Sequence, residues 1–358
     1  MYNRIGKAVN NDSEVFASMI ISRIQKTVVI ALLCTLFGPL WLSSQPASAA
    51  SLDPSLRQKT QVTPVDLLWN HALAGIRTEY YYESINGINE SLFLFRPNTQ
   101  SVAPLPLVVY IHGGGLYSGS AVIGETPDAH NFVMSRIEEK LIAHGIAFAS
   151  INYRLAPDFK WPTQLQDAKA AIRFLRANAA SLGIDPARIA VMGDSGGGEL
   201  ATFIGLTSHL SYGVAGPWLG ASSSVLAVVD MFGPTNRAYF AKKRLMQYGN
   251  LNDPVYGLYT PSAIYQESAI NYVQPGDPPF LIIQGEKDPL VPPSQSISLY
   301  HRLRDAGDNV RLILVRNAMH EFYPDGGSIH PSLLAISRTV SHFFENILLG
   351  QDTAASSH

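Results

Sequence analysis

The chain has 358 residues, of which 46% are hydrophobic and 15% are charged, and its formal net charge at pH 7 is −2. An apolar fraction of this size in a chain of this length is enough for one large domain with a substantial core. Lysine and arginine form no extended basic cluster. The composition therefore excludes a protein that depends on a basic surface to bind nucleic acid.

Residues 1–49 are typical of a secretory signal peptide. Basic side chains come first, a mostly apolar, uncharged run follows at 28–42, and Ala47-Ser48-Ala49 fits a small-x-small cleavage site. The apolar run is shorter than the ~20 residues of a membrane-spanning helix, although an uncleaved anchor is the alternative. Met19 is an alternative start. We expect an exported protein, secreted or periplasmic, without a membrane segment after cleavage.

Cleavage after Ala49 removes Cys34, which is the only cysteine. The mature chain then has no thiol, no disulfide and no cysteine metal site, and we predict no metal ligands. Residues 50–64 are polar and are predicted to form a flexible arm. Residues 65–349 are predicted to form one folded domain, and residues 350–358 a disordered tail.

Within this domain, apolar strands alternate with amphipathic helices. Residues 77–84 and 91–96 favour two antiparallel strands joined by Asn86-Gly87, a dipeptide typical of tight hairpins. The pattern predicts further strands at 107–111, 147–152, 189–192, 225–231, 280–284 and 310–315, and helices at 133–144, 164–182, 294–306 and 332–348. Asp185-Pro186 is expected to separate the second helix from the strand that follows. This alternation predicts an α/β domain with a mostly parallel central sheet and helices on both faces.

Residues 236–278 interrupt the alternation. They are rich in tyrosine and only weakly periodic. We interpret them as a small cap-like excursion over the carboxyl ends of the strands, where sheets of this kind place their functional groups. A solvated insertion without function is the alternative.

A G-x-S-x-G sequence, Gly193 to Gly197, stands between an apolar strand-like run and a helix-like run that begins near Glu199. On a strand-to-helix turn this pattern is typical of a nucleophile elbow, in which the serine has a strained backbone. Glycines let neighbouring backbone pass close to the serine, and the helix dipole favours negative charge there. We predict that Ser195 is the nucleophile.

A serine hydroxyl needs an adjacent base, and the base needs an orienting acid. Asp288 and His320 each follow a predicted strand. The order Ser195, Asp288, His320 is the order found in the α/β-hydrolase fold. We therefore predict that these residues form a catalytic triad.

Glu286 is an alternative to Asp288 as the acid, because it lies two residues nearer the strand. We favour Asp288, because the turn from Pro289 to Pro293 holds it rigidly. Asp194, beside the nucleophile, is expected to brace the turn rather than take part in the chemistry.

A glycine-rich sequence, His112-Gly113-Gly114-Gly115, follows the predicted strand 107–111. Successive glycine amides can turn inward around an oxygen and donate hydrogen bonds to an oxyanion. We predict that Gly113, Gly114 and Gly196 supply these donors, and that His112 braces the loop. A plain glycine-rich turn is the alternative.

Four motifs together resemble the α/β-hydrolase esterases. They are His112 to Gly115, Asn152-Tyr-Arg-Leu-Ala-Pro157, Gly193 to Gly197 and Asp288-Pro-Leu-Val-Pro292. Two branches are similar to this chain over about residues 107–322: the hormone-sensitive-lipase-like carboxylesterases and the bacterial feruloyl-esterase-like group called BD-FAE. The resemblance implies an α/β-hydrolase fold that hydrolyses carboxylic esters without a cofactor. It implies the same site residues, with Ser195 as nucleophile, Asp288 as acid, His320 as base, and Gly113, Gly114 and Gly196 as oxyanion donors.

The chain departs from the pattern of these esterases at two positions. Gly196 stands where alanine is common, and Glu199 where histidine is frequent. We expect a looser elbow from the first change. The second is expected to add negative charge near the entrance and to disfavour anionic substrates.

The sequence thus predicts a secreted serine esterase acting on short-chain acyl, acetyl or feruloyl-type esters, either small molecules or substituents on a polysaccharide. One alternative is a small serine exopeptidase of the prolyl-oligopeptidase type. Another is arylformamide hydrolysis, against which the export signal argues. A third is a non-catalytic binding protein on the same fold, which the intact set of site residues disfavours. The sequence indicates neither the oligomeric state nor the residues that bind the substrate.

Overall fold

A computed structural model of the chain describes residues 58–59, 75–85, 88–98, 103–123 and 128–350. The predicted signal peptide, most of the predicted arm and residues 351–358 lie outside the described residues. Two residues of the predicted arm, Gln58–Lys59, form strand β1 and pair antiparallel with the next strand. No helix in the described part of the chain is long and apolar enough to cross a membrane.

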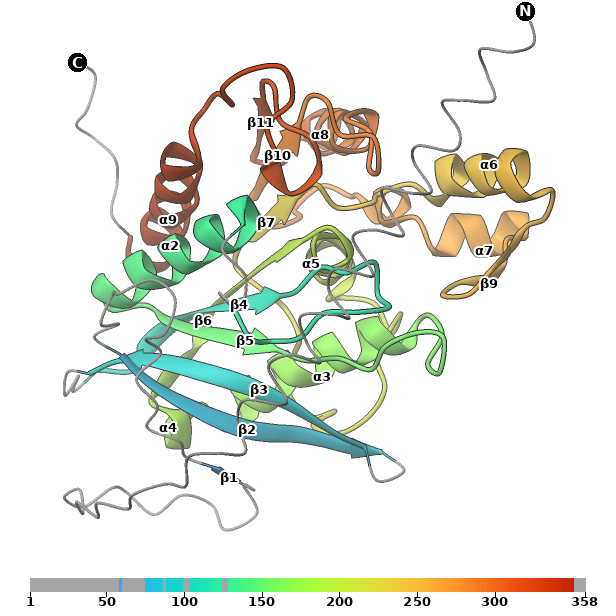
Figure 1. The fold of residues 1–358 in the computed structure, drawn as a ribbon. Coiled ribbons are helices and arrows are strands. Elements are labelled where there is room, and N and C mark those ends of the chain that lie inside the picture. Colours follow the sequence, from blue (N-terminus) through green and yellow to red (C-terminus); the bar gives the residue numbers. More distant parts are fainter. Residues whose placement is uncertain (1–57, 60–74, 86–87, 99–102, 124–127, 351–358) are drawn as a thin grey trace, which may run out of the picture. The chain divides into compact units, whose positions relative to one another are not determined.

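A mixed sheet forms the centre of the domain (Figure 1). Its nine strands have the order β1-β2-β3-β5-β4-β6-β7-β10-β11 in the described residues. Pairing is antiparallel from β1 to β5 and parallel from β5 to β11. The strands are β2 (Gly75–Ile85), β3 (Ile88–Pro97), β4 (Leu105–Ile111), β5 (Ala147–Ile151), β6 (Ile184–Asp194), β7 (Val228–Met231), β10 (Phe280–Gly285) and β11 (Val310–Val315).

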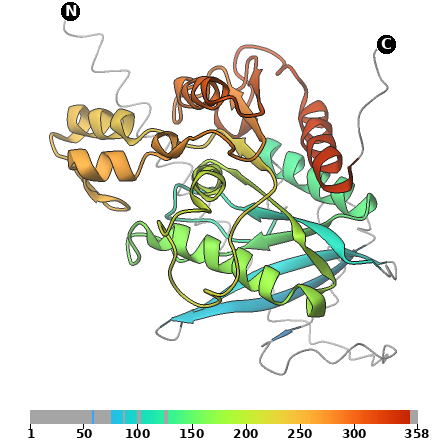
Figure 2. The ribbon, with the colours of Figure 1, turned by 180° about the vertical axis from the view of Figure 1, so that it is seen from behind.

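Helices cover both faces of this sheet, as predicted. Side chains alternate along β4, so that Leu107 and Val109 enter one core cluster and Val108 enters the other. The first cluster includes residues of α3 (Thr163–Ala177), α5 (Gly196–Thr207) and α8 (Ser294–Ala306). The second includes residues of α2 (Ala129–Ala143) and α9 (Leu333–Leu349). Figures 1 and 2 show these two helix layers from opposite sides.

Several predicted boundaries differ from the structure, and two of the differences lie just before the elbow. The helix predicted at 164–182 ends at Ala177, and a separate turn, α4 (Ala179–Leu182), follows it. The side-chain amide of Asn178 donates to the Phe174 carbonyl at 2.9 Å and so competes for the end of the helix. Strand β6 begins at Ile184, so Asp185-Pro186 lies inside it rather than before it. A register shift between Leu105 and Leu107 of β4 accommodates this proline near the start of the strand.

The excursion predicted at 236–278 connects β7 to β10. It consists of α6 (Arg237–Tyr248), a small antiparallel ladder of β8 (Asn252–Asp253) and β9 (Gly257–Leu258), α7 (Pro261–Gln266) and the 3₁₀ turn η1 (Ala269–Tyr272). The side chains of Asn236 and Thr260 cap the two α-helices. In Figures 1 and 2, α6 and α7 lie side by side, beyond the ends of the central strands.

Candidate active site

Ser195 lies at the turn between β6 and α5, with φ 49° and ψ −118°. This left-handed backbone is strained for a residue with a side chain. The strain is held by hydrogen bonds on both sides: the Ser195 amide donates to the Met231 carbonyl at 2.8 Å, and the Glu199 amide donates to the Ser195 carbonyl at 3.0 Å. The turn thus has the geometry expected of a nucleophile elbow.

The glycines around Ser195 are required by close backbone approach. A Cβ atom on Gly193 would lie 2.2 Å from the Gly197 carbonyl oxygen, and one on Gly197 would lie 2.0 Å from the Ile111 carbonyl oxygen. Neither approach leaves room for a side chain. The turn is therefore packed directly against the end of β4, the strand that leads into the glycine-rich loop.

The structure brings Ser195, His320 and Asp288 together. His320 begins the 3₁₀ turn η2 (His320–Phe322) after β11, and its Nε2 lies 3.0 Å from the Ser195 Oγ. Its Nδ1 lies 2.7 Å from the Asp288 Oδ2. The edge of the His320 ring packs against Phe232, with 4.8 Å between ring centroids. This relay can remove a proton from the serine hydroxyl and stabilise the imidazolium that results.

Asp288 is fixed by three further hydrogen bonds. Its Oδ1 accepts from the amides of Leu290 and Val291 at 2.9 and 3.0 Å, and its Oδ2 accepts from the Gln284 side-chain amide at 3.1 Å. Glu286, the alternative acid, is exposed. Gln284 was not predicted as a site residue, and its position in an apolar strand is the one signal in the sequence that indicates it.

The glycine-rich loop lies beside the elbow, but it does not present every predicted donor. The Gly113 amide donates to the Asp194 Oδ1 at 3.0 Å. This amide is therefore already paired, which argues against the predicted role of Gly113 as an oxyanion donor. A Cβ on Gly196 would lie 3.3 Å from the Gly115 amide nitrogen and 3.1 Å from that of Leu116. The amide nearest the elbow thus belongs to a later part of the loop.

Neighbouring motifs brace this loop. The Tyr153 hydroxyl donates to the His112 carbonyl at 2.9 Å, and the two rings stack with 4.3 Å between centroids. The His112 Nδ1 contacts the Gly113 carbonyl at 2.8 Å. Further along, the Asn152 side chain accepts from the Ala121 amide at 2.8 Å. The Asn152–Pro157 motif is therefore part of the scaffold of the loop.

Asp194 joins the elbow to the glycine-rich loop. Its Oδ1 accepts from the Gly113 amide and, at 2.7 Å, from the Tyr110 hydroxyl, while its Oδ2 lies 3.4 Å from the Nε2 of His130. Burial alone raises the pKa of Asp194, but His130 and Tyr110 together hold it below its ordinary value. These contacts are consistent with the bracing role predicted for Asp194. Its partners Tyr110 and His130 were not predicted, because they come from distant segments.

Glu199 is not at the entrance, contrary to the prediction. It is 1% exposed, forms an ion pair with Arg237, and accepts from the Tyr256 hydroxyl at 2.8 Å. The Arg237 guanidinium also lies over the Tyr256 ring, 3.8 Å from its centroid. The buried cation Arg237 compensates the charge of Glu199, and this pair links helix α5 to the excursion.

Aromatic side chains extend this link between the excursion and the body of the domain. The Tyr256 ring packs on Trp161, which in turn packs on Phe203 of α5 with 4.9 Å between centroids. Tyr212 and Tyr272 stack beside Phe203. The aromatic side chains of the excursion thus fall into two groups. Tyr256 and Tyr272 pack against the domain and anchor the excursion, whereas Tyr239, Tyr248 and Tyr265 are exposed.

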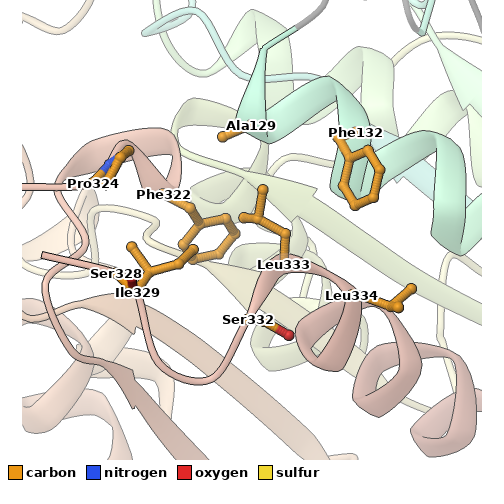
Figure 3. Close-up of a pocket in the computed structure, with 9 residues that line it drawn as sticks. All are labelled: Ala129, Phe132, Phe322, Pro324, Ser328, Ile329, Ser332, Leu333 and Leu334. Carbon is orange, nitrogen blue, oxygen red and sulfur yellow. The ribbon is translucent and has the colours of Figure 1, made fainter.

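A separate apolar pocket of about 500 Å³ lies next to the loop that carries His320 (Figure 3). Phe322 forms part of its wall, between the start of α2 and the start of α9. Neither Ser195 nor His320 lines this pocket. The pocket therefore belongs to the packing around the histidine loop, not to the nucleophile.

Comparison with known proteins identifies the family of this chain. Residues 92–303 match the model of the family described as BD-FAE. Esterase LipC of Mycobacterium tuberculosis is 31% identical over 252 residues, and the match covers 69% of this chain and 60% of LipC. The chain thus spans less than two thirds of the length of that relative.

Two further relatives are similar to this chain. Ethyl acetate hydrolase of Pseudomonas putida is 28% identical over 236 residues, covering 62% of this chain and 67% of that protein. A solved structure, a truncated carbohydrate esterase from gut microbiota, superposes with a TM-score of 0.60 at 27% identity, covering 76% of this chain and 96% of that one. These likenesses confirm the predicted α/β-hydrolase fold.

Proposed function

We propose that this chain, which belongs to the BD-FAE family of α/β-hydrolases, is a serine esterase that hydrolyses carboxylic esters through an acyl-enzyme. The observation that carries the proposal is the relay from the Ser195 hydroxyl through His320 to the buried Asp288. The names of the relatives, an esterase, an ethyl acetate hydrolase and a carbohydrate esterase, support the same reaction.

In the proposed mechanism, His320 Nε2 takes the proton of the Ser195 hydroxyl as the Oγ attacks the ester carbonyl. Asp288 holds the other ring nitrogen and stabilises the imidazolium. When the tetrahedral intermediate collapses, His320 gives its proton to the leaving alcohol and leaves an acyl group on Ser195. Water, activated by the same histidine, then releases the acid and restores the serine.

The oxyanion of each intermediate needs converging amides. We assign them to Gly196, directly after the nucleophile, and to the later glycines of the loop, Gly114 and Gly115. The closeness of the Gly115 amide to Gly196 supports this assignment, and the α5 dipole adds to it. Gly113 is left out because Asp194 already occupies its amide.

The proposed substrates are esters with short acyl groups, including acetyl or feruloyl groups linked to a polysaccharide. The likeness to a carbohydrate esterase supports the polysaccharide-linked class. We further propose that the excursion covers the acyl pocket, and that the protein is exported with cleavage after Ala49. Export is tested by the mass of the protein recovered outside the cytoplasm.

Hydrolysis of p-nitrophenyl esters from acetate to decanoate by the purified protein tests the proposal, with Ser195→Ala as the control. Turnover that disappears in the variant supports it, and a sharp maximum at acetate would direct the search to acetylated polysaccharides. Ester turnover that survives in Ser195→Ala would refute it. No ester turnover, combined with labelling of Ser195 by a fluorophosphonate and cleavage of aminoacyl anilides, would indicate the exopeptidase alternative. A folded protein that neither hydrolyses esters nor labels would indicate a binding protein.

A further inference from the structure

His130 is a titratable side chain beside the site that the proposed mechanism does not use. It lies in the first turn of α2, and its side chain is 14% exposed. Its Nε2 lies 3.4 Å from the Asp194 Oδ2. The Phe232 ring has an edge-to-face arrangement with both imidazole rings, with centroids 6.4 Å from His130 and 4.8 Å from His320. His130 is thus near the relay but acts on a different carboxylate.

The carboxylate that His130 contacts is the one that holds the glycine-rich loop. Asp194 is 2% exposed and directly precedes the nucleophile. Its other oxygen accepts from the Gly113 amide, and a Cβ on Gly113 would lie 2.2 Å from Oδ2. A shift of the Asp194 side chain would therefore move the start of the loop relative to Ser195.

The charges that face His130 come from three segments and are all acidic: Asp194 at the end of β6, Glu321 in η2, and Asp128 at the N-cap of α2. Burial alone lowers the pKa of the His130 imidazole, but these carboxylates, Asp194 first, raise it to about 9. The ring is therefore a cation at neutral pH.

Three other titratable side chains face Asp194. Burial lowers the pKa of His112 and raises the pKa values of Tyr110 and Tyr153 well above the ordinary value of tyrosine. All three groups are consequently neutral from pH 7 to 10, so they do not change the charge around Asp194 in the range in which His130 does.

We propose that His130 is a positioning residue for ester hydrolysis: its imidazolium holds the Asp194 carboxylate, which holds the Gly113 amide and thereby sets the oxyanion donors against Ser195. This inference rests on the proposed function. The developing oxyanion depends on this alignment more than the bound ester does. Loss of the His130 charge should therefore lower kcat and leave KM nearly unchanged.

The pH profile of kcat, with p-nitrophenyl butyrate from pH 6.5 to 10.5, tests the proposal on the wild type and on His130→Gln. The wild type should lose activity as the pH rises through about 9. His130→Gln should be slower by at least about tenfold at pH 7.5, because a small misplacement of catalytic groups costs this much. The variant should also lack the alkaline decrease. His301→Gln, at an exposed position of α8, is the matched control and should keep the wild-type profile.

A double-mutant cycle with Asp194→Asn tests the route of the effect. If His130 acts only through Asp194, adding His130→Gln to Asp194→Asn should change kcat by less than about twofold. Independent, multiplying effects would overturn the proposal, as would a wild-type kcat without an alkaline decrease near pH 9. The wild-type profile decides the matter even if His130→Gln does not fold. Turnover in Ser195→Ala would instead refute the esterase mechanism, whatever His130 does.

Discussion

Replacing Arg237 should uncouple the excursion from the nucleophile helix. Arg237 is 5% exposed, and Glu199, its partner, is 1% exposed. Arg237→Met leaves a buried carboxylate whose pKa burial already raises, with only the Tyr256 hydroxyl as donor. Removing one partner of a buried ion pair typically costs about 3–5 kcal/mol. For a domain of this size that corresponds to a decrease in Tm of roughly 10 °C.

The reasoning is tested by a thermal-unfolding cycle of Arg237→Met, Glu199→Gln and the double variant at pH 7. The double variant buries no unpaired charge, so it should be more stable than the sum of the two single effects predicts, by about 2 kcal/mol or more. Arg304→Met is the matched control. Arg304 and its partner Asp305 are both exposed, so removing this arginine should leave the Tm unchanged. If the losses of stability in the two single variants simply add in the double variant, the ion pair does not anchor the excursion.

Three further predictions concern single side chains. Asp288→Asn should lower kcat about 10⁴-fold at an unchanged Tm, because the amide favours the wrong tautomer of His320; a loss below about tenfold would contradict its role. Gly113→Ala should lower kcat/KM about 100-fold in the ester assay, because its Cβ would lie 2.2 Å from the Asp194 carboxylate; an unchanged rate would argue against the close approach of Gly113 to Asp194. Burial raises the pKa of Glu138 to about 8 although Arg77 opposes this, so folding binds a proton there, and the wild type loses stability as the pH rises from about 4.5 to about 8. Glu138→Gln should accordingly gain denaturant stability relative to the wild type at pH 8 and not at pH 4.5, and an equal difference at both pH values would contradict the assignment.

The relay could be predicted because each of its members follows a strand that local patterning reveals. Ser195, Asp288 and His320 stand after apolar runs, and parallel strands bring their carboxyl ends to one edge of the sheet. The order of the three residues along the chain then indicates which of them is the nucleophile, the acid and the base. The structure places the three side chains within hydrogen-bonding distance. The parallel sheet and its two helix layers follow from the same periodicity.

The remaining features depend on contacts between segments that no local pattern connects. The partner of the Gly113 amide, Asp194, lies 81 positions further along the chain, so no local pattern indicated that this amide is already paired. Glu199 was misplaced because the cation that allows its burial, Arg237, lies in the weakly periodic excursion. His130 belongs to a helix with no motif, and its role emerges only when α2 packs near the end of β6.

The excursion begins and ends on strands that are already neighbours. Val228 pairs with Phe280 and Met231 with Ile283, so the register of β7 and β10 is held by the sheet itself. The entropic cost of closing a connection between these two strands rises only slowly with the length of the connection. This segment can therefore be lengthened, shortened or replaced while the strands that precede Ser195, Asp288 and His320 stay unchanged. In the esterase proposed above, such changes would alter the choice of ester without altering the residues that carry out the reaction.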